Sequence, residues 1–99
     1  MHPPSNGPGR FHIDIAPIIT ERIKTLHGVA AGGGPEFRAA FRRLLDRLRS
    51  DALTCGEPVY PLRAMGLIVR QVVEPPIVAH YTAHPQRRVV WFSSLNLLS

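Results

Sequence analysis

The chain has 99 residues, of which 44% are hydrophobic, and this length fits one small domain rather than two. Its apolar runs fall far short of the ~18 residues of a membrane-spanning helix, so we expect no contact with a membrane. Twelve Lys and Arg residues against seven Asp and Glu give a net charge of +5, and eleven of the twelve are Arg. This balance favours an anionic partner, such as a nucleic acid or an acidic protein segment. The single cysteine, Cys55, excludes an internal disulfide and a CxxC metal motif, as is typical of a cytoplasmic protein.

The chain begins with a segment that differs in composition from the rest. Residues 1–9 are rich in proline and glycine and contain no apolar stretch, which predicts a disordered leader rather than a secretory signal. Residues 10–99 are then expected to form the single domain. Residues 10–15 alternate polar and apolar side chains, the period of a half-buried strand.

Two amphipathic helices are predicted next. Pro17 fixes the backbone for a helix start, and apolar residues recur at helical spacing up to about Ala31. The glycines at 32–34 are expected to end this helix and turn the chain, and Pro35 then opens the second helix. The second helix carries the clearest apolar stripe of the chain: Phe37, Phe41, Leu44, Leu45 and Leu48. Arginines cover the rest of its surface. A stripe that faces RNA or DNA is one interpretation of them, and a solvated helix face is the one that we favour.

The second half of the chain predicts strands joined by short turns. The expected strands are 59–62, 67–73, 77–83 and 88–94. Pro61 places the first of these at a sheet edge. The order β-α-α-β-β-β-β predicts an α+β fold of two layers, with a helical hairpin packed on one face of a mainly antiparallel sheet. No helix remains to cover the other face, and a function or a partner is expected there.

Side-chain parity suggests a site on that open face. If Ile77 and Tyr81 point at the helices, His80 points away from them. Arg70 is the charged residue of its strand and is therefore expected beside His80. An arginine binds phosphate through charge-assisted hydrogen bonds, and a histidine moves protons near neutral pH. The alternative is a solvated face with scattered polar residues.

Three other arginines are candidates for binding phosphate. Arg63 follows the first expected strand of the second half, and Arg87 and Arg88 lie at a hairpin turn. No metal site is expected, because the pair His80 and His84 would share a face only on a helix. The sequence contains no phosphate-binding glycine loop and no paired carboxylates, so no cofactor is expected either.

The strand segments carry a family resemblance. Four strand-like segments follow the predicted helix pair: Gly56 to Arg63, Leu67 to Arg70, Ile77 to Tyr81 and Arg88 to Phe92. In this order they resemble the RelE/ParE toxin superfamily, and the resemblance covers nearly the whole domain. It implies the same β-α-α-β-β-β-β order that the periodicity predicts.

The resemblance implies a toxin of a bacterial type II toxin–antitoxin pair. Toxins of the RelE branch cleave mRNA on the ribosome, and those of the ParE branch poison DNA gyrase. A ribonuclease would use Arg70 and His80 as catalytic groups, with Arg63, Arg87 and Arg88 on the phosphates. The implied partners are a cognate antitoxin and either the ribosome with its mRNA or gyrase.

Two departures from the family pattern leave a second function open. The family pattern has an arginine at the position of Val78, in the expected strand 77–83. RelE-type ribonucleases also carry an Arg and a Tyr near the end of the last strand and beyond it. The sequence here ends in Leu95 to Ser99 without either residue. The alternative is therefore a non-catalytic binding module, either a gyrase-inhibiting toxin or a degenerate toxin that binds only its antitoxin.

Overall fold

The computed structural model describes residues 10–29 and 34–98. The elements in chain order are β1 (His12–Asp14), α1 (Pro17–Val29), α2 (Gly34–Asp51), β2 (Glu57–Leu62), η2 (Arg63–Met65), β3 (Leu67–Glu74), β4 (Ile77–His84) and β5 (Val89–Leu97). This is the predicted order, with one short 3-10 turn added between β2 and β3. The expected leader at 1–9 lies outside the described residues.

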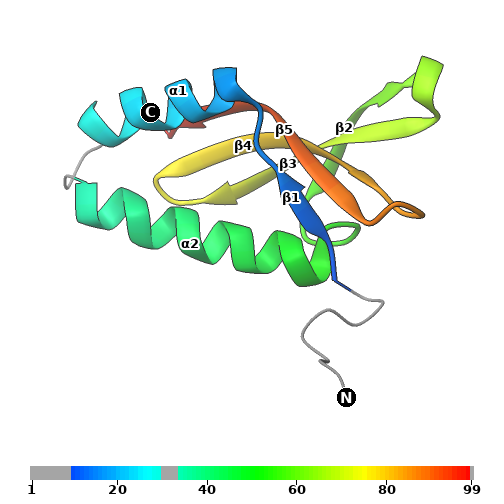
Figure 1. Cartoon of the computed structure of the whole chain (residues 1–99), viewed down its shortest axis with the longest axis horizontal. Coiled ribbons are helices and arrows are strands. Elements are labelled where there is room, and N and C mark those ends of the chain that lie inside the picture. The colour runs from blue at the N-terminus through cyan, green and yellow to red at the C-terminus, as the bar shows by residue number, and fades with distance from the viewer. Residues whose placement is uncertain (1–9, 30–33, 99) are drawn as a thin grey trace.

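The strands form one five-stranded sheet in the order β1-β5-β4-β3-β2 (Figure 1). β2, β3, β4 and β5 are antiparallel to their neighbours, while β1 runs parallel to β5 at the far edge. β2 lies at the other edge, where Pro58 and Pro61 offer no backbone N–H to another strand. The predicted α+β class, the mainly antiparallel sheet and the edge position of β2 are confirmed.

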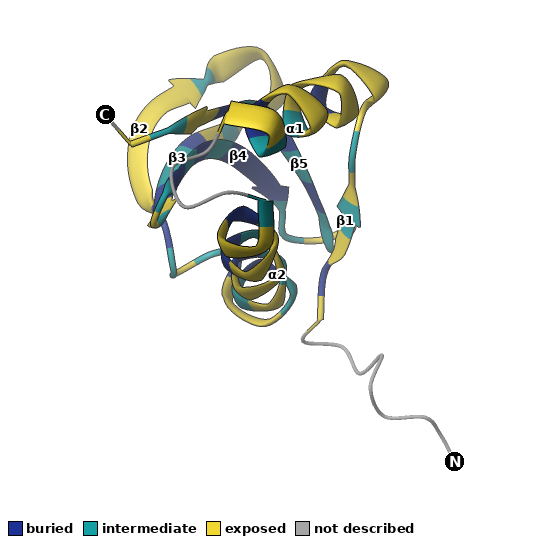
Figure 2. Cartoon of the chain, turned by 90° about the vertical axis from the view of Figure 1, so that its left-hand side faces the viewer, coloured by how far each residue is buried: buried dark blue, intermediate teal, exposed yellow. Residues whose placement is uncertain are grey.

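Both helices pack on the same face of this sheet, as predicted. α1 buries Ile19 and Leu26, and α2 buries Phe37, Leu44 and Leu48. They meet sheet residues of a single face in one apolar cluster, and α2 lies within the curve of the sheet (Figure 2). The sheet contributes Val72, Ile77, Ala79, Tyr81, Ala83, Val90, Phe92 and Leu95 to this cluster. Burial of these side chains is the main stabilising contribution to a domain of this size.

Several element ends differ from the sequence-based expectation. α2 begins at Gly34, so this glycine is helical; the rest of the expected turn lies outside the described residues. α2 also continues to Asp51, and β5 extends beyond Ser94 to Leu97. The extension of β5 follows from its pairing with β4, where Leu97 faces Ile77 across the ladder.

A cluster of ion pairs joins α2 to the end of β3. The Glu74 carboxylate accepts hydrogen bonds from Arg43 Nε at 3.0 Å and from Arg47 Nη1 at 2.9 Å. The hydrogen bond from Arg43, aided by Arg47, holds the pKa of Glu74 below its ordinary value against the opposing effect of burial. Arg47 also donates to the carbonyl oxygen of Val73 at 3.2 Å. Two of the arginines of α2 therefore bind within the domain itself.

A buried tyrosine fixes the chain between α2 and β2. The Tyr81 hydroxyl donates to the Ala52 carbonyl oxygen at 2.7 Å, and burial raises the pKa of Tyr81 far above its ordinary value. A Cβ at Gly56 would lie 2.6 Å from that hydroxyl, so this position needs glycine. Among the described residues, no helix is long and apolar enough to span a membrane.

Candidate binding groove between the helices

Arg70 and His80, the expected catalytic pair, lie on opposite faces of the sheet. In the β3–β4 ladder His80 is opposite Gln71, whereas Arg70 is opposite Tyr81. Residues directly opposite each other on antiparallel strands point to the same face. Tyr81 is fully buried against the helices, so Arg70 points to the helix-covered face and His80 to the open face. The prediction that both share the open face is wrong.

The error comes from the composition of β3. Val69 and Val72 are both buried, at 1% and 2% exposure, although they point to opposite faces. Alternation along this strand therefore does not reveal which face is covered. Arg70 is accommodated on the covered face because it lies near Gly56, and its Nη1 donates to the Gly56 carbonyl oxygen at 3.0 Å. Its guanidinium thus has a structural partner.

His80 is held by two neighbours on the open face. Its Nε2 lies 2.9 Å from Gln71 Oε1, and its Nδ1 lies 3.2 Å from Ser94 Oγ. An amide oxygen only accepts, so Nε2 carries the hydrogen and Nδ1 accepts from the serine hydroxyl. Both ring nitrogens therefore have a partner within the domain.

The three remaining arginine candidates do not gather around His80. Arg63 lies in η2 and Arg87 in the turn after β4, in two separate hairpin connections at one end of the sheet (Figure 1). Arg88 has a left-handed backbone with φ of 57°, and its guanidinium carbon lies 4.0 Å from the centre of the Phe11 ring. Arg88 therefore packs on the core by a cation–π contact.

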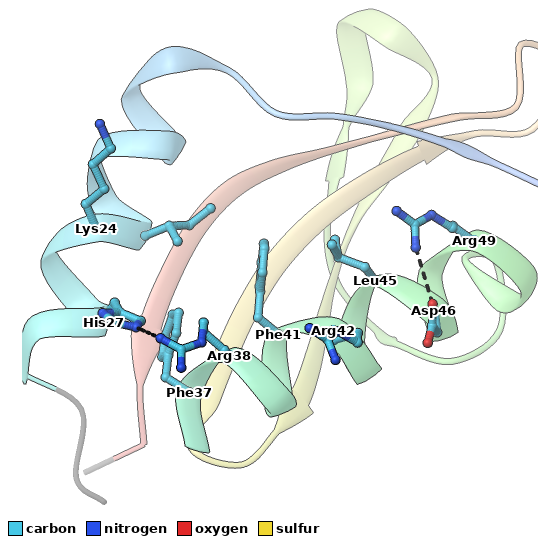
Figure 3. Close-up of a pocket in the computed structure, with 10 residues that line it drawn as sticks. Lys24, His27, Phe37, Arg38, Phe41, Arg42, Leu45, Asp46 and Arg49 are labelled. Atoms are coloured by element: carbon cyan, nitrogen blue, oxygen red, sulfur yellow. Dashed lines mark hydrogen bonds and ion pairs between the residues drawn. The ribbon is translucent and has the colours of Figure 1, made fainter. Parts of the chain in front are cut away.

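A hollow in the described surface lies between α1 and α2 (Figure 3). It has a volume of about 780 Å³. Its floor is apolar and consists of Ile23, Phe37, Phe41 and Leu45. Its rim is charged and consists of Lys24, His27, Arg38, Arg42, Asp46 and Arg49. We call this hollow the helix groove.

The groove exists because the two helices touch at one end and then diverge. At the touching end the His27 ring meets Phe37 edge-on, and Arg38 Nη1 donates to His27 Nε2 at 3.0 Å. A Cβ at Gly34 would overlap the His27 ring, so the start of α2 lies close against α1. Away from this contact the helices separate (Figure 3), and Phe41 and Leu45 stay only half-buried. The predicted apolar stripe of α2 is therefore partly open to solvent.

Positive charge dominates the groove rim. The rim contains four cationic side chains, Lys24, Arg38, Arg42 and Arg49, and one carboxylate, Asp46. Asp46 accepts a hydrogen bond from Arg49 at 3.2 Å. Lys24 pairs with Glu21 at 3.4 Å, but both side chains are about 70% exposed, so the pair contributes little. Arg42 makes no hydrogen bond or ion pair with another described residue. The groove thus combines an apolar floor with cations available to an anionic partner.

Sequence reasoning did not locate this groove, although it named the arginine-rich surface, together with the open sheet face, as a place for an acidic antitoxin segment. Arg38 and Arg42 directly follow Phe37 and Phe41, so they flank the apolar stripe. That adjacency was the available signal. The divergence of the two helices, which opens the stripe, has no counterpart in the sequence. In the part of the chain that the structure describes, His, Cys, Asp and Glu side chains form no cluster suited to a metal ion.

Comparison with known proteins adds no assignment. The chain matches no protein-family model. It also matches no curated protein and no solved structure.

Proposed function

We propose that this chain is the toxin component of a bacterial type II toxin–antitoxin pair, of the RelE/ParE kind, and that it acts in the cytoplasm as a binding module. The β-α-α-β-β-β-β order, with a helix pair on one sheet face, supports this proposal. The motif resemblance of the strand segments supports it as well. The proposed partners are a cognate antitoxin and a target protein.

The opposite orientation of Arg70 and His80 favours binding over catalysis. RNA cleavage needs a group that moves the 2′-hydroxyl proton and a cation that stabilises the phosphorane at the same phosphate. His80 and Arg70 point away from each other across the sheet, and Arg70 already binds the Gly56 carbonyl. A ParE-like action on gyrase, which requires protein contacts only, is consistent with this geometry.

A RelE-like endoribonuclease is the second candidate, favoured by the orientation of His80. Gln71 and Ser94 fix the ring of His80, which lies half-buried on the open face, at the surface where an RNA would have to bind. Cations for the phosphates would have to come from Arg63 and Arg87 at the end of the sheet. The two candidates differ in whether His80 is needed.

Induced expression in a bacterial host tests the proposal. We expect the wild-type chain to inhibit growth and the product of the neighbouring reading frame to relieve the inhibition and co-purify. His80→Gln is expected to stay toxic, with primer extension showing no new mRNA cleavage in either strain. Loss of toxicity in a folded His80→Gln variant would support the ribonuclease instead. A wild-type chain that neither inhibits growth nor binds the neighbouring product would refute the toxin proposal.

A further inference from the structure

We propose that the helix groove binds an acidic amphipathic helix of about three turns from a partner protein. The proposed function bears on this inference only in the identity of the protein that carries the helix. The inference is drawn from the apolar floor, the charges of the rim and the dimensions of the groove.

The floor indicates a protein segment rather than a nucleic acid. Ile23, Phe41 and Leu45 pack against the core from one side and remain half-exposed on the other. A phosphate backbone or a ribose would leave these aliphatic and aromatic surfaces wet, whereas leucine-type side chains would bury them. Helix-in-groove recognition places such side chains at i, i+3 or i+4, and i+7. A third helix would therefore complete the apolar contact that α1 and α2 leave open.

The rim specifies the charge of that helix. Lys24 lies on the α1 side of the groove, and Arg38 and Arg42 lie on the α2 side (Figure 3). Carboxylates on both flanks of the partner's apolar stripe would face these cations. At the far end Asp46 accompanies Arg49, so a neutral or basic residue suits that end better. The rim therefore favours acidic residues at the end of the partner helix that lies near His27.

The length of the groove sets the length of the helix. The lining residues of α2 run from Phe37 to Arg49. At a rise of about 1.5 Å per residue this is about 18 Å, or about three helical turns. Helices pack with their axes about 8–10 Å apart, and an open trough between two diverging helices accepts a third at that spacing. A helix this short is marginal alone in water, so we expect it to form on binding.

A synthetic peptide provides the probe. It has about 14 residues, leucines at i, i+3, i+4 and i+7, and glutamates on both flanks. A matched control peptide has the same composition in an order that destroys the apolar stripe. We expect the first peptide to bind the full chain in a fluorescence anisotropy titration and to gain a helical circular dichroism signal on binding. We expect its affinity to fall with added salt. Equal binding of the scrambled peptide would overturn the inference, because attraction of charge alone would then explain it.

Charge-reversed variants locate the binding. Arg42→Glu with Lys24→Glu is expected to weaken peptide binding by about tenfold or more. The matched control Arg63→Glu with Arg87→Glu makes the same change in net charge at two exposed residues outside the groove lining and is expected to have a much smaller effect. Similar weakening by both variants would overturn the inference. Displacement of the peptide by an equal concentration of a single-stranded RNA oligonucleotide would do so too, since the groove would then be a nucleic-acid surface.

The outcome separates this inference from the proposed function. Peptide binding that depends on Arg42, by a chain that neither inhibits growth nor binds the neighbouring product, would support the groove and refute the toxin proposal. A toxic chain that binds the antitoxin but does not bind the acidic peptide would support the toxin proposal and refute the groove.

Discussion

The two faces of the sheet differ in how their polar groups are used. On the open face His80 hydrogen-bonds Gln71 and Ser94, so its polar groups satisfy one another. On the helix-covered side the groove leaves apolar surface half-exposed, and Arg42 without a described partner stands at its rim. Charge and accessible apolar surface together are what a binding partner requires. The face covered by helices, rather than the uncovered one, therefore carries the better candidate site.

The largest expected effect is a loss of stability on truncation in the core beneath the helices, compared with truncation in the groove floor. Leu44 is fully buried, and truncation to Ala is expected to lower the free energy of unfolding by about 2–5 kcal/mol. Its neighbour Leu45, half-buried in the groove, is the matched control and is expected to lose about half as much. Urea denaturation measures both. Equal losses would mean that the groove floor is as tightly packed as the core.

A buried hydroxyl on the covered face gives the next effect. Tyr81→Phe leaves the Ala52 carbonyl without its donor and is expected to cost about 1–2 kcal/mol in the free energy of unfolding. Tyr60→Phe removes a hydroxyl from a side chain that is half exposed on β2 and is expected to change stability by less than about 0.5 kcal/mol. If Tyr81→Phe left the free energy of unfolding unchanged, the hydrogen bond would not stabilise the segment before β2.

Glu74 predicts a pH dependence. Its pKa is lowered in the folded chain from the ordinary 4.5, so the unfolded chain binds the proton more tightly. The stabilisation is therefore complete above about pH 4.5 and is lost as the pH falls through the lower folded value. Glu74→Gln is expected to cost about 1 kcal/mol at neutral pH and to flatten this acid limb of the stability profile.

The matched control for Glu74 is an exposed carboxylate. Among the described residues Glu21 pairs only with Lys24, and both are largely exposed. Glu21→Gln is expected to leave the stability profile close to that of the wild type in urea denaturation at the same pH values. If Glu74→Gln left the loss of stability at acid pH unchanged, the stabilising role of the ion pairs of Glu74 with Arg43 and Arg47 would be contradicted.

The smallest expected effect lies on the open face. Ser94→Ala removes one hydrogen bond to a half-buried His80 and is expected to cost about 0.5 kcal/mol or less. The same urea series measures it. A cost equal to that of Tyr81→Phe would show that the polar cluster of the open face contributes to stability as the core does.

Sequence periodicity predicted most of the fold and little of the site. The apolar stripe of α2 and the alternation of β4 both point to one buried face, so the layers were predicted correctly. β3 has buried valines on both faces, Val69 and Val72, and parity could not orient Arg70. β5 continues to Leu97 because it pairs with Ile77, a contact distant in sequence. Local patterns thus define elements, whereas register and helix divergence depend on tertiary contacts.

A nitrogen-15 chemical-shift titration with the acidic amphipathic peptide tests the central claim most directly. We expect the largest shifts on amides of the groove, at Ile23, Phe41, Arg42 and Leu45. Trp91 pairs with Thr82 and therefore lies on the open face with His80, and both are expected to change little. Shifts concentrated at His80 and Trp91 would contradict the central claim and return the functional surface to the open face of the sheet.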